Sequence, residues 1–296
     1  MIITVTLSPA IDRILAVPGF RARRTLKARV VAVVPAGKGV NVSRYLSALG
    51  VRSVATGFVG ARERALYEES FAGTGITPAF VAVDAPTRLN TTILGERGRR
   101  ETHLREEGFA APREKREALR RTLLRYARAG NTFVFAGALP LKFAPAELAR
   151  LIRELRASGA AVAVDASGPA LAAAVRAGCD VISPNEDELR ETGMSPELLL
   201  RRVGALALKL GAKGGVLYLR DGTFRARAAV PARRVLNTVG AGDAFLAGLL
   251  AARAQRLSPS ALIRSAVAAG AAAVVAGVVG RLDRATWARF RPKPVL

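Results

Sequence analysis

Short apolar runs alternate with segments of helical periodicity along most of the chain. Residues 42–49, which end at Gly50, and residues 145–157 have the spacing of amphipathic helices. Strands that alternate with helices in this way favour a parallel sheet covered by helices on both faces. The predicted fold class is therefore α/β, with ligands bound at the carboxyl ends of the strands. Six runs are predicted to be its buried strands: 2–7, 53–59, 131–136, 161–165, 179–183 and 206–210.

Two regions lack this alternation and have the composition of short strands joined by turns. Residues 13–34 form the first region, and residues 87–104, with a turn expected at 96–99, form the second. We expect them to pair as a small sheet beside the main one. A further hairpin is predicted around Asp221-Gly222. No repeat or linker divides the chain, so we do not expect sequential domains.

The chain is strongly basic, with 46 Lys and Arg against 23 Asp and Glu and a net charge of +23. Such a charge suggests a polyanionic partner. Only seven of the basic residues are lysines, however, and the arginines are spread along the whole chain, which indicates a compositional bias. A cluster between Arg116 and Arg128 recurs at helical spacing beside leucines and predicts a solvated helix face. Because no recognisable binding module accompanies it, we favour that face over a nucleic-acid interface.

Composition also bounds the class and the location of the protein. With 50% hydrophobic residues the chain can bury a large core, so disorder is not expected. The single cysteine, Cys179, excludes a disulfide framework and fits a reducing cytosol. The first ten residues lack the basic patch and apolar run of a signal peptide. The longest uncharged stretch, 265–280, is shorter than the roughly 18 to 20 apolar residues that span a bilayer. We therefore expect a cytoplasmic protein with no membrane partner, and a close-packed helix in that stretch.

Residues 237–245 carry the strongest candidate chemistry. They follow a strand-like run and open an apolar helix, so the backbone N–H groups of Gly240, Ala241 and Gly242 can converge on an anion at the positive end of the helix dipole. Asp243 follows at once and would repel that anion unless it had a purpose. In phosphoryl transfer it would take the proton from the attacking hydroxyl while the amides hold the transferred group. The alternative is that Asp243 only caps its helix.

The nonapeptide 237–245 resembles the C-terminal signature of the ribokinase-like (PfkB) carbohydrate kinases. Residues 6–13 look like the opening of the phosphosugar branch of that family, and residues 36–44 resemble its first glycine-rich signature. The resemblance extends through nearly the whole chain. It implies an ATP-dependent kinase, built as a three-layer sandwich with a mostly parallel central sheet and a small β-sheet lid.

The same resemblance implies a domain organisation and a partner. We expect a single kinase domain over residues 1–296, with the lid formed by about 12–35 and 87–105. Relatives often dimerise through the lid, and the exposed edges of a small sheet suit such an interface. A homodimer is therefore expected.

A group of residues in the first third of the chain is expected, by resemblance, to bind a sugar phosphate. Asp12 and Asn41 would hold hydroxyl groups. Arg88 falls in a segment similar to the branch's Thr-Arg-x-Asn element, and its guanidinium fork would hold the phosphate that the sugar already carries. A solvated hairpin arginine is the alternative. The other expected contacts are the glycine-rich segment and a second phosphate contact: Gly37, Lys38, Gly39 and Lys27.

Two later segments are assigned to the nucleotide side by resemblance. Asn185 and Glu188 would hold Mg²⁺ through water, because magnesium keeps much of its hydration and needs few protein ligands. An acidic first turn that favours the helix dipole is the alternative. In the other segment, glycines would let the backbone approach the phosphates of ATP, with a simple turn as the alternative. The residues assigned there are Lys209, Gly211 and Gly214, and Thr238 of the segment 237–245 is also assigned to nucleotide binding.

Departures from the family pattern concern the substrate. Ala136 and Ala138 stand where relatives commonly have serine, which removes a hydroxyl contact to the substrate phosphate, and Ser183 stands where the branch often has lysine. We favour fructose 1-phosphate as substrate, with tagatose 6-phosphate and fructose 6-phosphate as alternatives that these motifs do not separate. A function of a different class is a further alternative: a catalytically weakened kinase fold that acts as a basic polyanion-binding protein.

Overall fold

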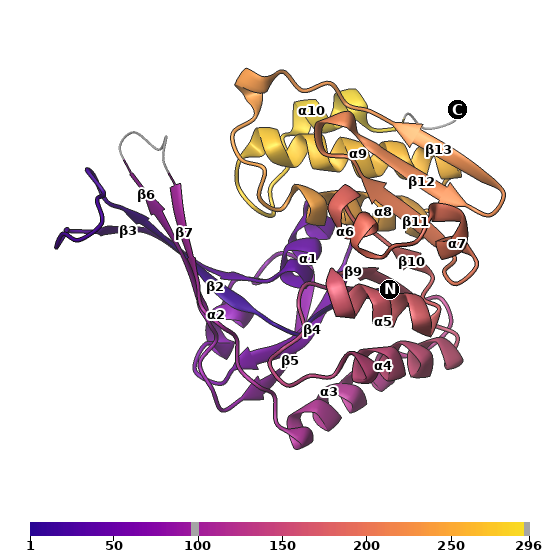
Figure 1. Cartoon of the computed structure of the whole chain (residues 1–296), viewed down its shortest axis with the longest axis horizontal. Coiled ribbons are helices and arrows are strands. Elements are labelled where there is room, and N and C mark those ends of the chain that lie inside the picture. The colour runs from indigo at the N-terminus through magenta and orange to yellow at the C-terminus, as the bar shows by residue number, and fades with distance from the viewer. Residues whose placement is uncertain (96–100, 293–296) are drawn as a thin grey trace.

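The computed structural model describes residues 1–95 and 101–292, and the turn predicted at 96–99 lies outside them. Within this part of the chain, nine strands form one sheet in the order β13-β12-β11-β10-β9-β8-β1-β4-β5 (Figure 1). The strands from β11 to β5 in that order run parallel, and the hairpin of β12 and β13 adds two antiparallel strands at one edge. The strands are β1 (Ile2–Thr6), β4 (Ser53–Gly60), β5 (Ile76–Val83), β8 (Thr132–Ala136), β9 (Ala161–Asp165), β10 (Val181–Ile182), β11 (Ala205–Lys209), β12 (Gly215–Leu219) and β13 (Gly222–Ala226).

Helices cover both faces of this sheet, because the inner strands are buried at nearly every position and most of their residues are apolar. Along β8, Phe133 and Phe135 enter one hydrophobic cluster while Val134 and Ala136 enter the other. The first cluster is closed by α3 (Arg113–Tyr126), α4 (Pro145–Ala157) and α5 (Gly168–Ala177). The second is closed by α1 (Lys38–Ala48), α8 (Ala241–Ala254) and α9 (Pro259–Ala276), against which α10 (Arg284–Phe290) packs. The predicted α/β sandwich with a mostly parallel sheet is thus confirmed.

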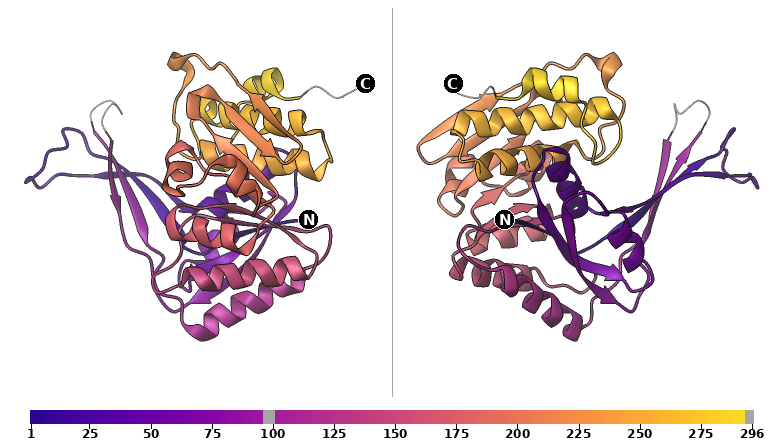
Figure 2. Two further views of the ribbon diagram at one scale, coloured as in Figure 1. Left: turned by 45° about the vertical axis from the view of Figure 1, so that its right-hand side comes forward. Right: turned by 180° about the vertical axis from the view of Figure 1, so that it is seen from behind.

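A second, four-stranded sheet projects from the layered body (Figure 2). Its order is β3-β2-β6-β7, so β3 and β7 are the edges. The strands are β2 (Ala10–Ala16), β3 (Arg29–Ala36), β6 (Leu89–Leu94) and β7 (Glu101–Arg105). The expected small sheet is therefore present, and we call it the lid sheet. Leu104 of β7 is 55% exposed. On β3, four valines are between 38% and 57% exposed: Val30, Val31, Val33 and Val34.

Several predicted boundaries were wrong for local reasons. The helix expected from residue 42 begins at Lys38, because Thr6 Oγ1 accepts the Val40 N–H and holds the glycine-rich turn against β1. The hairpin turn is Arg220-Asp221, since Leu219 pairs with Gly222. The strand expected at 179–183 is only Val181–Ile182. The acidic helix turn expected at 185–188 is present as the start of α6 (Glu186–Glu191). Sequence patterns missed elements with weak periodicity: β5, α2 (Arg64–Glu69), α5, α7 (Pro196–Leu200), η2 (Gly211–Lys213), η3 (Ala232–Arg234) and α10.

The arginine-rich helix is not simply a solvated face. Arg116 pairs with Glu147, and Arg120 Nε lies 2.7 Å from Glu154 Oε2, so α3 is bound to α4 through ion pairs. Half-exposed pairs of this kind contribute little energy individually. They do neutralise part of the positive charge that suggested a polyanionic partner.

The expected close-packed helix in the uncharged stretch is α9, which runs from Pro259 to Ala276. By length and composition alone it could cross a membrane, but half of it is buried in the structure. It crosses α8 closely at Gly248, where a Cβ would lie 2.5 Å from the Ser265 carbonyl oxygen. The helix is thus a component of the core.

Candidate active site

The segment 237–245 forms a turn that delivers Asp243 to the centre of the molecule. The sequence predicts this apolar helix from Ala244 to Ala252, whereas α8 begins three residues earlier at Ala241, after Gly240 at φ +80°. A Cβ at Gly240 would lie 2.9 Å from Tyr45 Oη, so only glycine fits. The Ala241 N–H donates to the Thr238 carbonyl at 3.2 Å. Of the expected anion-binding amides, those of Gly240 and Gly242 are left without a partner among the described residues.

Asp243 does not cap its helix. No side chain caps the N-terminus of α8, and Asp243 Oδ2 instead accepts a hydrogen bond from Asn41 Nδ2 of α1 at 2.9 Å. Burial raises the pKa of Asp243 to about 7, and the negative charge of Asp165 adds to the effect. The Asn41 hydrogen bond and the two nearby ammonium groups oppose it. A carboxylate with such a pKa is matched to taking a proton near neutral pH.

Sequence reasoning missed Asp165, which organises the charges around Asp243. It ends β9 at the carboxyl edge of the sheet and is 1% exposed. Its two oxygens lie 3.3 Å from Lys38 Nζ and 2.9 Å from Lys209 Nζ. Burial favours the neutral acid, but the two ammonium groups outweigh it and hold the pKa of Asp165 below its ordinary value. The available signal was a carboxylate at the end of a predicted buried strand.

Lys38 and Lys209 therefore share the Asp165 carboxylate, each beside one of its oxygens. Burial would lower the pKa of Lys38, but the carboxylates of Asp165, Asp243 and Glu188 raise it above the ordinary value. A Cβ on Gly242 would lie 3.5 Å from Lys209 Nζ, so this ammonium lies beside the first turn of α8. Lys38 therefore stays charged, and the two ammonium groups can attract a phosphoryl group.

On the other side of Asp243, the base of the lid sheet carries a polar cluster. Asn90 Nδ2 donates to Asp12 Oδ1 at 2.9 Å. Asn90 Oδ1 and Asn41 Oδ1 are buried and have no partner among the described residues. Buried amide oxygens without partners are costly, so a ligand hydroxyl is the expected donor here.

Two arginines accompany this cluster. Burial lowers the pKa of Arg88, and so does the positive charge of Arg105 on β7. Neither guanidinium forms an ion pair within the described part of the chain, although Arg88 Nε donates to the Pro9 carbonyl at 3.2 Å. Two like charges placed together form an anion site. Sequence reasoning missed Arg105, because arginines are so frequent in this chain that a single one does not indicate a binding site.

The other expected substrate contacts divide into two groups. Gly37, at φ +134°, and Gly39 start α1 beside Lys38, and a Cβ on Gly39 would lie 2.5 Å from Thr6 Oγ1. These glycines bring the helix N-terminus close to β1. Lys27 instead lies in the exposed loop between β2 and β3, and no contact joins it to the cluster around Asp12 in the described residues.

The four residues assigned to nucleotide binding share one cavity. This cavity, of about 370 Å³, is lined by Lys209, Gly211, Gly214 and Thr238 together with Gly242. Gly214, at φ +98°, allows the chain to pass β13, where a Cβ would lie 2.1 Å from the Ala226 carbonyl. The remaining lining is largely apolar, which suits an aromatic base. Its members include Val235, Phe245, Val267 and Val274.

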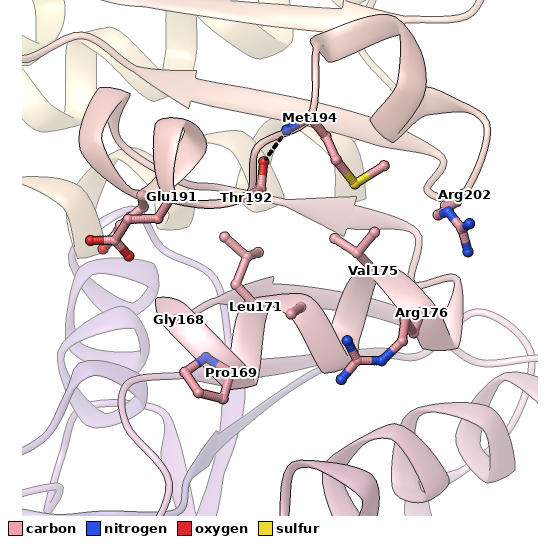
Figure 3. A pocket seen from close by; sticks show the side chains of 11 residues that line it. Gly168, Pro169, Leu171, Val175, Arg176, Glu191, Thr192, Met194 and Arg202 are labelled. Atoms are coloured by element: carbon pink, nitrogen blue, oxygen red, sulfur yellow. Dashed lines mark hydrogen bonds between the residues drawn. The ribbon is translucent and has the colours of Figure 1, made fainter.

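Asn185 and Glu188 form a capping box on α6, in line with the alternative interpretation of these residues. Asn185 Oδ1 accepts the Glu188 N–H and Glu188 Oε2 accepts the Asn185 N–H, both at 2.8 Å. They do not line the nucleotide cavity. Glu188 lines a separate groove of about 410 Å³ in which Leu171 and Val175 rise from α5 toward Met194 (Figure 3).

The residues present fit magnesium only through water. Among the described residues, no group of three or more His, Cys, Asp or Glu could hold a metal ion. The negative charge of Glu188 nevertheless helps to raise the pKa of Lys38, so its carboxylate lies near the same centre. A hydrated ion needs only one or two carboxylates.

A buried carboxylate of raised pKa beside a helix N-terminus, with a polar cluster on one side and a largely apolar cavity on the other, fits a phosphotransferase that acts on a hydroxyl group. The chain belongs to the pfkB family carbohydrate kinases, which it matches over residues 3–280. It is thus an ATP-dependent kinase of sugar hydroxyls.

The comparisons with individual proteins agree. The chain is 32% identical to the 1-phosphofructokinase of Vibrio cholerae over 96% of this chain and 92% of that protein. It is 35% identical to the 1-phosphofructokinase of Rhodobacter capsulatus over 90% of this chain and 88% of that protein. Phosphofructokinase-2 from Escherichia coli has the same fold, with a TM-score of 0.88 at 24% identity over 98% of this chain and 97% of that one.

Proposed function

We propose that this kinase transfers the γ-phosphate of ATP to the free primary hydroxyl of fructose 1-phosphate and yields fructose 1,6-bisphosphate. The observation that carries the proposal is the proximity of Arg88 and Arg105 at the base of the lid sheet, where Arg105 pairs with Asn90 across the strands. Two guanidinium groups that form no ion pair among the described residues suit a substrate that already bears a phosphate. The names of several relatives, 28% to 35% identical over most of the chain, support the same substrate.

In the proposed mechanism the sugar phosphate binds between the lid sheet and α1. Arg88 and Arg105 hold its phosphate, while Asp12, Asn90 and Asn41 hold its hydroxyl groups. Asp243 accepts the proton of the attacking hydroxyl as the new O–P bond forms, while the bond from the γ-phosphorus to the bridging oxygen breaks and ADP leaves with that oxygen.

The transferred group is stabilised from the opposite side. The Gly242 N–H and the ammonium groups of Lys38 and Lys209 face the charge that develops on it. Asn185 and Glu188 would hold Mg²⁺ through water, and the ion would neutralise the phosphates of ATP. Closure of the lid sheet would exclude water and suppress ATP hydrolysis.

A screen of acceptors tests the substrate. ADP release from ATP and Mg²⁺ should be measured with fructose 1-phosphate, fructose 6-phosphate, tagatose 6-phosphate and fructose. We expect the highest kcat/KM for fructose 1-phosphate. A preference for unphosphorylated fructose would refute the role of the two arginines. Salt-dependent binding to heparin without ADP release for any acceptor would favour the polyanion-binding alternative.

We further propose that two copies associate through the lid sheets in the cytosol. The support is the run of exposed valines on edge strand β3, because an exposed apolar edge invites pairing. Val33→Asp should convert a dimer into a monomer in sedimentation velocity, since burial of a charge there is unfavourable. Leu198→Asp, at an exposed leucine of α7, is the control and should leave the dimer intact. A monomeric wild-type protein at micromolar concentration would contradict this proposal.

A further inference from the structure

The short helix α2 (Arg64–Glu69) lies where the lid sheet leaves the main body (Figure 1). Its Tyr67 is fully buried and packs edge-on against Phe80, with ring centroids 5.4 Å apart. The Tyr67 hydroxyl lies 2.6 Å from the Ala10 carbonyl oxygen and 2.9 Å from that of Ala36. Ala10 is the first residue of β2, Ala36 is the last of β3, and the two pair across the strands. One hydroxyl thus lies within hydrogen-bond distance of both residues of the Ala10–Ala36 pair, where the lid sheet begins.

The third strand that leaves the body is held by the same part of the chain. Glu63, the residue that precedes α2, accepts the Thr87 N–H on Oε2 at 2.9 Å. Thr87 Oγ1 in turn accepts the Gly60 N–H at 2.8 Å. These bonds fix the chain just before β6 begins at Leu89.

Each of these anchors adjoins a residue of the sugar-phosphate site. Asp12 is two positions after Ala10, Arg88 directly follows Thr87, and Gly37, which starts the Asn41 helix, directly follows Ala36. A phenylalanine would satisfy the packing against Phe80 equally well. The hydroxyl is therefore explained by what it holds, since burying a polar group is costly unless it is bonded.

We propose that Tyr67 and Glu63 are positioning residues, which fix the base of the lid sheet and thereby set the placement of Asp12, Arg88 and Asn41 for the sugar phosphate. The inference rests on the proposed function for its substrate. It predicts that the anchors affect sugar-phosphate binding and leave nucleotide binding alone, because the nucleotide cavity is formed by β11, η2, α8 and α9.

Tyr67→Phe is the first test. We expect KM for fructose 1-phosphate to rise about threefold to tenfold, the usual value of one hydrogen bond, while KM for ATP stays within a factor of about two of wild type. Tyr126→Phe, at the end of α3, is the matched control and should change neither constant. An unchanged KM for the sugar phosphate, or an equal rise for both substrates, would overturn the proposal.

Glu63 offers a conservative rescue. In Glu63→Gln the amide oxygen can still accept the Thr87 N–H, so KM should stay near the wild-type value. Glu63→Ala loses the acceptor and should raise KM for the sugar phosphate as Tyr67→Phe does. If the alanine and glutamine variants behave alike, Glu63 does not position the site.

Hydrogen exchange of the free protein separates this inference from the proposed function. Amides in residues 10–16 and 29–36 should exchange faster in Tyr67→Phe than in wild type, because the Ala10–Ala36 pair loses its hydrogen bonds to the Tyr67 hydroxyl. Unchanged exchange would refute the anchor itself. If the wild-type protein phosphorylates no sugar phosphate, the proposed function fails, and faster exchange would still support the anchor.

Discussion

Asp243→Asn is expected to lower kcat by roughly 10²- to 10⁴-fold, the usual contribution of a general base. Asparagine has nearly the same shape and can still bond to Asn41, but it cannot take the proton of the attacking hydroxyl. The amide-lined turn and the ammonium groups of Lys38 and Lys209 remain, so residual turnover is expected. Steady-state ADP release with fructose 1-phosphate measures the effect, and KM for both substrates should change little.

The pH dependence of the wild-type enzyme is a second readout of the same role. Because burial raises the pKa of Asp243 to about 7, the carboxylate is protonated below that pH and ionised above it. Only the ionised form accepts a proton, so kcat/KM should rise with pH through about 7 and level off above it. Asp221→Asn, in the exposed hairpin turn, is the control and should follow the wild-type profile. More than a tenth of wild-type turnover in Asp243→Asn would exclude Asp243 as the base.

The sequence was informative where short segments carry their own chemistry. The Gly240-Ala241-Gly242-Asp243 turn could be interpreted as an anion site because helix N-termini bind anions in any fold. The order of strands and helices gave the parallel sheet, and α4 was predicted at its observed ends because Pro145 and strong amphipathicity mark it.

The rest of the site depends on contacts between distant parts of the chain. The Asp165 carboxylate forms ion pairs with Lys38 and Lys209, which come from distant parts of the chain. No local sequence pattern predicts these ion pairs. Tyr67 looked like an ordinary core residue of a helix that periodicity did not detect. The capping box of Asn185 and Glu188 could be predicted locally, whereas the influence of Glu188 on Lys38 could not.

Arg88→Gln is expected to lower kcat/KM for fructose 1-phosphate by about 10²-fold, because one charge-assisted contact to a largely desolvated phosphate is lost. The activity toward unphosphorylated fructose, however low, should hardly change. Arg88→Lys should recover only part of the loss, since an ammonium group cannot make the two parallel bonds of a guanidinium fork. Comparing kcat/KM for the two acceptors in each variant measures the specificity that the arginine provides.

The comparison also separates a phosphate contact from a structural role. Arg88 Nε donates to the Pro9 carbonyl, so its loss could instead disturb the start of β2. A structural defect would lower activity with fructose and fructose 1-phosphate by the same factor, and that outcome would contradict phosphate binding. Arg13→Gln is the matched control, because Arg13 lies next to Asp12 on β2 and donates from Nη2 to Thr91 Oγ1. Successive residues of a strand point to opposite faces, so this guanidinium lies away from the sugar and its loss should leave the preference for the phosphorylated acceptor intact.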